Sequence, residues 1–207
     1  PCVFEVAGVK MGLLICEDAW FEAPAQNARD AGAQLLLVLN ASPFHVGKGL
    51  EREVQMGQRV QECGLPLVYA HLVGGQDEVI FEGRSFALNA KAEVVARAPA
   101  FQECLQTIHI QNQAGSEGLQ ISGTEVCASS SWQEDLWHAL VLGIRDYLGK
   151  NGFPGAILGL SGGIDSALVL ALAVDALGAD KIHAVMMPSP YTADISWIDS
   201  REMVQRL

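Results

Sequence analysis

The segment Ser161-Gly162-Gly163-Ile164-Asp165-Ser166 has the residue types and spacing of an anion-binding loop. An apolar run precedes it and a long run rich in Ala and Leu follows it, so the pattern predicts a buried strand that turns into a helix. Glycines let a ligand approach the backbone, and the first N–H groups of a helix have no partner within the helix. With the hydroxyls of Ser161 and Ser166, these donors favour a bound phosphate.

Asp165 places a carboxylate beside this predicted phosphate site. Two negative groups repel each other unless a cation lies between them, so the pattern predicts Mg²⁺ bound at Asp165. The loop has neither the lysine of G-x-x-x-x-G-K-[ST] nor the glycine spacing of G-x-G-x-x-G. The alternative is a glycine turn that only packs helix on strand, with Asp165 and Ser166 as helix caps.

A second candidate for chemistry is Cys16, which follows an apolar strand predicted over 9–15. A strand end can present a nucleophile at the edge of a sheet, and the N–H groups beyond it can face an oxyanion. The thiol would need a base or a lowered pKa to react. The alternative is a small core residue, which is the usual role of an isolated cysteine in an apolar strand.

The first part of the chain alternates strand-like and helix-like segments, which indicates an α/β fold. We expect helices over 24–31 and 49–63. The strands are predicted over 9–15, 34–39, 67–72, 94–98 and 107–110, with a hairpin of 79–81 and 85–89 around Glu82-Gly83-Arg84.

A change in composition divides the chain. Residues 113–131 are rich in Gln, Ser, Gly and Ala, so we predict a linker between a domain of residues 1–112 and a second one of residues 132–207. In the second, an amphipathic helix begins at Trp132, and strand 156–160, helix 166–177 and strand 182–187 form one βαβ unit. Such a unit implies a parallel sheet.

The composition limits the partners. The chain has 24 acidic and 13 basic residues, a formal net charge of −11, which argues against nucleic acid. Five scattered cysteines without metal-ligand spacing indicate a reducing, cytoplasmic location and no disulfide framework. No apolar run approaches the ~20 residues that cross a bilayer, so we expect no membrane contact. The chain begins at Pro1 without methionine and stops within an apparent helix, so we expect a fragment.

The stretch Gly-Leu-Ser-Gly-Gly-Ile-Asp-Ser resembles the pyrophosphate loop of the ATP pyrophosphatases. Residues 141–207 as a whole resemble the synthetase domain of the glutamine-dependent NAD synthetases, which has a doubly wound parallel sheet of the adenine nucleotide alpha hydrolase type. The resemblance implies Mg²⁺ at Asp165. It also implies that ATP is bound by eight residues, which are Gly159, Leu160, Ser161, Gly162, Gly163, Ile164, Asp165 and Ser166.

The stretch Ile-Cys-Glu-Asp-Ala-Trp, residues 15–20, resembles the nucleophile motif of the nitrilase-superfamily glutaminase domain, an αββα sandwich that is fused to NAD synthetases. The resemblance makes Cys16 the nucleophile. It assigns Ser42 and Lys48 to the α-amino and α-carboxylate groups of glutamine. The family's base Glu and its Lys come from well upstream of the Cys and would precede Pro1, so we expect this chain alone not to hydrolyse glutamine.

Together, the two resemblances imply part of a ligase that converts deamido-NAD⁺ to NAD⁺ with ammonia taken from glutamine. ATP would be cleaved to AMP and pyrophosphate, glutamate would be released, and the parent enzyme would be a homo-oligomer. Two alternatives stay open. One is another ATP-pyrophosphatase amidotransferase, such as a GMP or asparagine synthetase, and the other is a non-catalytic nucleotide-binding relative.

Overall fold

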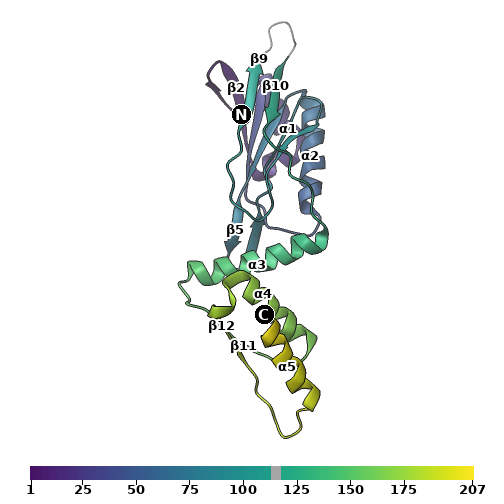
Figure 1. Ribbon diagram of the computed structural model, residues 1–207. Coiled ribbons are helices and arrows are strands. Elements are labelled where there is room, and N and C mark those ends of the chain that lie inside the picture. The colour runs from purple at the N-terminus through teal and green to yellow at the C-terminus, as the bar shows by residue number, and fades with distance from the viewer. Residues whose placement is uncertain (113–117) are drawn as a thin grey trace. The chain divides into compact units, whose positions relative to one another are not determined.

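The computed structural model describes residues 1–112 and 118–207 of the chain (Figure 1). They form two compact units. The first unit comprises Pro1–Gly74 and Phe81–Asp135, and the second comprises Gly75–Ile80 and Leu136–Leu207. Each unit has a parallel β–α arrangement with one candidate site at the carboxyl ends of its strands.

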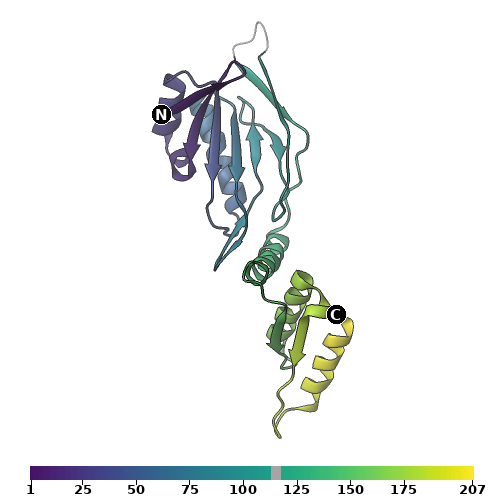
Figure 2. The same ribbon diagram turned by 90° about the vertical axis from the view of Figure 1, so that its left-hand side faces the viewer.

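A six-stranded sheet in the order β1-β2-β3-β4-β7-β8 forms the centre of the first unit (Figure 2). The three middle strands β2, β3 and β4 run parallel, and the outer strands pair antiparallel with their neighbours. The strand bounds are β1 Cys2–Val6, β2 Val9–Ile15, β3 Leu35–Asn40, β4 Leu67–His71, β7 Phe86–Leu88 and β8 Val94–Arg97. Because parallel strands end at one edge, the residues after β2, β3 and β4 come together.

The helices α1, Glu22–Asp30, and α2, Lys48–Cys63, cover one face of this sheet. Their apolar sides pack with every second residue of the parallel strands, such as Leu36 and Val38, and the core they form includes Met56 and Val60. Strands β9, Ile108–Asn112, and β10, Leu119–Gly123, form a hairpin that packs on the opposite face. The predicted strands and helices of this unit are confirmed to within a few residues.

The predicted hairpin of 79–81 with 85–89 is wrong. Strand β6, Val79–Glu82, pairs instead with β5, Val73–Gln76, while β7 pairs with β4 and β8. The chain reverses at Asp77, whose φ of 50° is left-handed. Aspartate tolerates this conformation. Gly83 and Arg84 are also left-handed, with φ of 69° and 56°, but they connect β6 to β7, which pair with different strands.

The predicted linker also contains regular structure. Part of it, residues 113–117, lies outside the described residues, but 119–123 form β10, and Leu119 and Ile121 are buried against the sheet. The strand was not predicted because only two apolar side chains mark its two-residue period, and they stand in a polar stretch. The domain boundaries at 112 and 132 stay a prediction.

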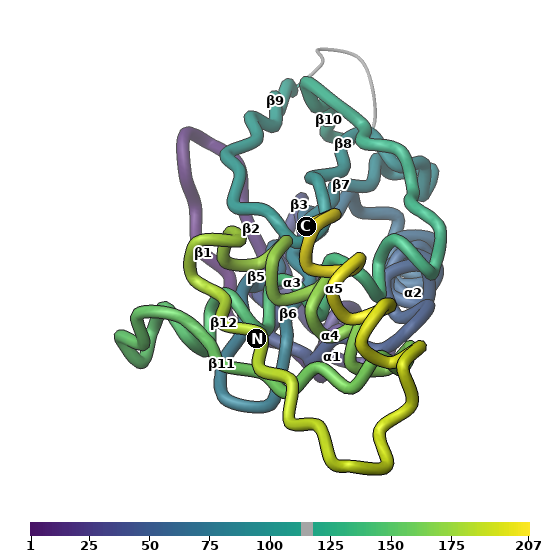
Figure 3. The backbone as a smooth tube through the Cα atoms, turned by 60° about the horizontal axis from the view of Figure 1, so that its bottom comes forward, coloured from purple at the N-terminus to yellow at the C-terminus, as the bar shows by residue number. Residues whose placement is uncertain are grey.

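The second unit contains the predicted βαβ unit. Helix α3, Trp132–Lys150, precedes β11, Ala156–Gly159, and α4, Ile164–Leu177, leads through the short turn η2, Ala179–Lys181, to β12, Ile182–Val185. Figure 3 shows β11 beside β12, with which it pairs in parallel, and α5, Asp194–Arg206, at the end of the chain. Among the described residues, no helix combines the length and apolarity required to traverse a bilayer.

Candidate functional site

Cys16 lies directly after β2 and begins the 3-10 turn η1, Cys16–Trp20. Its φ of 49° is left-handed, which is uncommon for a residue with a side chain and occurs at sites where the fold imposes a fixed orientation. The Asp18 carboxylate accepts the Ile15 N–H at 3.0 Å and closes the turn. Cys16 is half-buried and lines an open hollow of about 500 Å³ together with residues such as Asn40 and His71.

Asn40 ends β3 and connects this hollow to Ser42. Its Nδ2 donates to the Ser42 Oγ at 3.0 Å and also to the hydroxyl of Tyr69 on β4. Its Oδ1 is buried and has no hydrogen-bond partner among the described residues. Burial raises the pKa of the Tyr69 hydroxyl, which therefore stays protonated. The carboxyl ends of β2, β3 and β4 thus bring Cys16 and Ser42 to one edge of the sheet.

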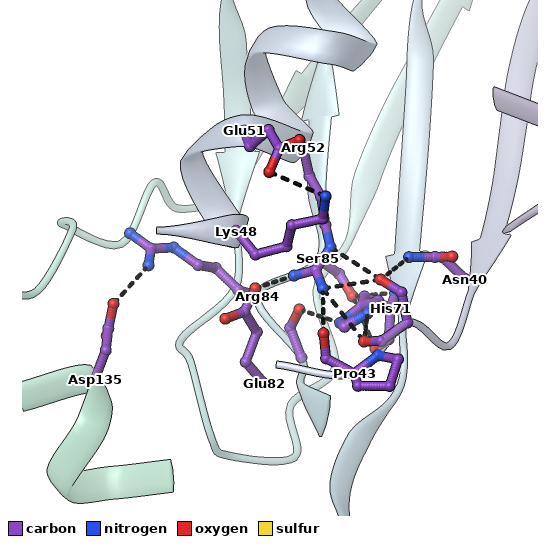
Figure 4. Close-up of polar contacts among 12 residues, drawn as sticks. Asn40, Pro43, Lys48, Glu51, Arg52, His71, Glu82, Arg84, Ser85 and Asp135 are labelled. Atoms are coloured by element: carbon purple, nitrogen blue, oxygen red, sulfur yellow. Dashed lines mark hydrogen bonds and ion pairs between the residues drawn. The ribbon is translucent and has the colours of Figure 1, made fainter. Parts of the chain in front are cut away.

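A buried ion pair between Arg52 and Glu82 lies against Ser42. Arg52 of α2 and Glu82 of β6 are each 2% exposed, and the Arg52 Nη1 donates to the Glu82 carboxylate. The Arg52 Nε and Nη2 contact the Ser42 Oγ, and Nη2 also donates to the carbonyl oxygens of Ser42 and Pro43. Figure 4 shows Arg52 in contact with Glu82. Burial raises the pKa of the Glu82 carboxyl, and the charges of Arg52 and Arg84 oppose that rise.

His71, at the end of β4, holds the other side of the same loop. Its Nδ1 lies 2.9 Å from the Gly83 carbonyl oxygen and its Nε2 lies 3.1 Å from the Ser42 carbonyl oxygen. Burial and the charge of Arg52 lower the pKa of His71 to about 4, so the ring is neutral at pH 7. A neutral imidazole donates through one nitrogen only, so one of these two carbonyls receives its N–H.

Lys48 begins α2 and lies near the turn η1. Its Nζ is 4.2 Å from the ring centroid of Trp20, the last residue of η1, and 3.0 Å from a Glu51 carboxylate oxygen. A cation over an indole face is attracted to it, which restricts the lysine to this position. Cys16, Ser42 and Lys48, predicted from two separate stretches, therefore lie within one connected region.

The glycine loop of the second unit has a different construction. The Ser161 and Ser166 hydroxyl oxygens are 3.0 Å apart, and Ser166 donates to the Gly163 carbonyl at 3.0 Å. Gly162 has a φ of 81°, and a Cβ there would lie 2.6 Å from backbone atoms of Ser196. Glycine is therefore required, and the loop keeps one shape through its own serines.

Helix α4 begins at Ile164, so its first N–H groups have no carbonyl to bind within the helix. Asp165 is exposed in this first turn. A neighbouring hollow of about 350 Å³ also carries Asp199, Glu202 and Arg206 of α5. The described residues contain no group of three His, Cys, Asp or Glu side chains fit to hold a metal alone. One carboxylate beside bound phosphates is nevertheless a usual setting for Mg²⁺, so the loop fits the predicted ion.

The fold and the two sites define an α/β protein with a cysteine at the end of a parallel strand and a separate glycine loop between a strand and a helix. The chain belongs to the carbon-nitrogen hydrolase family, whose profile matches residues 2–117. Residues 136–207 match the profile of the NAD synthase family. The predicted fold class is confirmed by these matches.

The relatives in sequence confirm the resemblance to the glutamine-dependent NAD synthetases. The chain is 44% identical over 96% of its length to the glutamine-dependent NAD(+) synthetase of Rhodobacter capsulatus. It is 42% identical over 99% of its length to that of Acinetobacter baylyi. It covers 36% and 37% of these two proteins, so it spans about a third of the length of the curated relatives it matches.

The solved structures agree in fold. The glutamine-dependent NAD⁺ synthetase of Acinetobacter baumannii in complex with ADP gives a TM-score of 0.87 at 40% identity, covering 99% of this chain and 38% of that one. The corresponding enzyme from Cytophaga hutchinsonii gives 0.76 at 18% identity, again covering 99% and 38%, which supports the fold alone.

The sequence did not reveal the residues that hold the first site together. Asn40, Arg52, His71 and Glu82 were assigned no role from their patterns. Arg52 and Glu82 are 30 positions apart, and Ser42 and His71 are 29 apart, so no local period connects them. The signal available was weaker: an arginine lies four residues after Lys48, on the same face of a helix.

Proposed function

We propose that this chain is an internal part of a glutamine-dependent NAD⁺ synthetase. The observation that carries the proposal is the 44% identity over 96% of the chain, which includes both the cysteine turn and the glycine loop. In this proposal the first unit belongs to the glutaminase and the second to the ATP-dependent synthetase. Its partners are glutamine, ATP and deamido-NAD⁺, and the homo-oligomer and the cytoplasmic location stay predictions.

In the glutaminase half, Cys16 attacks the carboxamide carbon of glutamine. The C–N bond breaks, and the nitrogen takes up the thiol proton and leaves as ammonia. The thioester that forms is hydrolysed by water to glutamate. Ser42 and Lys48 bind the amino acid end of the substrate. The left-handed backbone at Cys16 supports this role, because it holds the thiol in one direction at the edge of the sheet. The Glu and Lys that the resemblance implies would come from the part of the enzyme that precedes this chain.

In the synthetase half, the loop Gly159–Ser166 holds the β- and γ-phosphates of ATP while AMP is transferred to the carboxylate of deamido-NAD⁺. Pyrophosphate leaves, and ammonia displaces AMP to give NAD⁺. The N–H groups at the start of α4 support phosphate binding, and the two serine hydroxyls support it by holding the shape of the loop. Asp165 would hold Mg²⁺, which supplies positive charge against the phosphates when bound.

The test compares two nitrogen sources in the full-length enzyme. NAD⁺ formation from deamido-NAD⁺ and Mg-ATP is measured with glutamine or with ammonium. Cys16→Ala is expected to lose the glutamine reaction and keep the ammonium reaction, whereas Asp165→Ala is expected to lose both. Cys104→Ala, which removes an exposed thiol, is the matched control.

Failure of the wild type with both nitrogen sources would mean a different ATP-pyrophosphatase reaction or a non-catalytic relative. Survival of the glutamine reaction in Cys16→Ala would make Cys16 a structural thiol. Ammonium-dependent turnover in Asp165→Ala would remove the carboxylate from the ATP site.

A further inference from the structure

The hydrogen bonds around Ser42 determine what its hydroxyl can do. The Ser42 Oγ accepts from the Arg52 Nη2 at 2.8 Å and from the Arg52 Nε at 3.2 Å. The Asn40 Nδ2 reaches the same oxygen at 3.0 Å. A serine oxygen has two acceptor sites and one O–H, and a guanidinium is always a donor. The two N–H groups of the Arg52 guanidinium converge on one acceptor site of Ser42 and the Asn40 amide takes the other, so only the O–H remains for a ligand.

Arg52 also fixes the backbone that carries this hydroxyl. Its Nη2 donates to the Ser42 carbonyl oxygen at 3.2 Å and to the Pro43 carbonyl oxygen at 3.3 Å. His71 lies against the Ser42 carbonyl from the other side. Side-chain and main-chain atoms of the same serine are thus bound by one buried cation, so the direction of the Ser42 side chain is set before a substrate arrives.

The two amino acid groups of an amide substrate make opposite demands. An α-carboxylate accepts hydrogen bonds, whereas an α-ammonium donates them. A serine that can only donate suits the carboxylate and not the ammonium. Lys48 is also a donor without acceptor capacity, so the two predicted contacts of this site have the same polarity.

We infer that Arg52 is a positioning residue that makes the Ser42 hydroxyl an obligatory donor to the α-carboxylate of the amide substrate. The inference rests on the proposed glutaminase function and decides between the two groups that the resemblance left shared between Ser42 and Lys48. Glu82 is the counter-ion that keeps the buried guanidinium in place, and its contact to Arg52 uses Nη1, the nitrogen that does not contact Ser42.

The experiment measures ammonia release by the full-length enzyme from three amides. Glutamine has both charged groups, glutaramate lacks the α-amino group, and 4-aminobutanamide lacks the α-carboxylate. The variants are Ser42→Ala, Arg52→Lys and the double variant. Arg52→Lys keeps a positive charge beside Glu82, but one ammonium cannot reproduce the fork that binds Ser42.

Both single variants are expected to lower kcat/KM about tenfold for glutamine and glutaramate, mainly through KM, because a hydrogen bond to a charged group is lost. The loss on 4-aminobutanamide, which has no α-carboxylate, is expected to be much smaller. The double variant is no worse than Ser42→Ala, because Arg52 acts through Ser42. Arg59→Lys is the matched control, since Arg59 is buried on the same helix and pairs with Glu62 instead.

Three results would each overturn the inference. They are equal losses on all three amides, losses confined to amides that carry the α-amino group, and additive losses in the double variant. If Arg52→Lys does not fold, the double replacement Arg52→Met with Glu82→Leu removes the whole ion pair and is expected to give the same substrate pattern. A wild type that releases no ammonia from glutamine contradicts the proposed function and is recognised before any variant is compared.

Discussion

The two candidate sites of this chain differ in how their polar groups are satisfied. In the first unit, Ser42 is surrounded by a buried ion pair, a buried histidine and a buried amide. In the second, Asp165 is exposed and the helix N–H groups beside it have no partner within the helix. The first site is organised throughout by its own protein groups, whereas the second uses its serines to hold the loop and leaves the N–H groups at the start of α4 available to a ligand.

Because of this difference, substitutions in the two sites should affect stability and ligand binding to different degrees. A buried charge that loses its partner destabilises the fold, while an exposed carboxylate contributes little to it. Substitutions in the Arg52 network should therefore act on folding as well as on substrate binding. Substitutions at Asp165 should act on ligand binding alone.

The largest effect is expected for Glu82→Ala. Removing the carboxylate leaves the guanidinium of Arg52 buried and uncompensated, which should lower the free energy of unfolding of the first unit by about 3–5 kcal/mol. Amide hydrogen exchange in α2 of the full-length protein measures this locally. Asp30→Ala, which removes the exposed partner of the exposed Arg29, is the control and should cost far less. Equal effects of the two substitutions would contradict the distinction.

Acidification should weaken the first unit through His71. Its folded-state pKa of about 4 lies below the ordinary value of 6.5, so the unfolded chain binds a proton more readily. The stability contributed by neutral His71 is fully present above pH 6.5 and is lost as the pH falls through 4. The free energy of unfolding should fall by about 3 kcal/mol over this range. The Glu82 carboxyl, whose pKa is raised, acts in the opposite direction.

Comparison with His71→Gln isolates the histidine from the other titrating groups. Unfolding of the first unit is followed in urea between pH 7 and pH 4, and the variant should show the flatter pH dependence. A parallel loss of stability in both proteins would assign the acid sensitivity elsewhere.

Gly162→Ala should disturb the second unit and leave the first unchanged. The added Cβ meets Ser196 backbone atoms at 2.6 Å, and the residue must keep a φ of 81°. Such strain costs about 1–3 kcal/mol. Hydrogen exchange in α4 reports it, and Gly149→Ala, within α3 and with open space around its Cβ, is the control. Undisturbed exchange in α4 would show that the loop shifts without cost.

The smallest effect on stability is expected for Asp165→Asn. The side chain is exposed, so the free energy of unfolding should change by no more than about 0.5 kcal/mol. Binding of Mg-ATP to the full-length enzyme, measured by calorimetry, should nevertheless be lost or strongly weakened. Normal Mg-ATP affinity together with normal stability would leave Asp165 without a role in the second site.

Local patterns predicted most of the elements. The apolar run 9–15 became β2 without a change of bounds, and the helix predicted over 49–63 begins one residue earlier. The predicted pairing of 79–81 with 85–89 failed, and the strand β10 within the predicted linker was not foreseen, because both depend on which strand is available as a neighbour. Strand pairing is decided by the whole sheet and not by the residues of one strand.

By itself, the sequence determined the α/β class, the glycine loop with its serines and aspartate, and the cysteine at a strand end. These features depend on neighbouring residues, whose spacing is visible in the chain. Only the tertiary structure decided that Arg52 and Glu82 form a buried pair and that Arg52 and Asn40 both donate to the hydroxyl oxygen of Ser42. The physical reason is burial: parallel strands bring distant residues to one edge, and a charge removed from water there must find its partner across the fold.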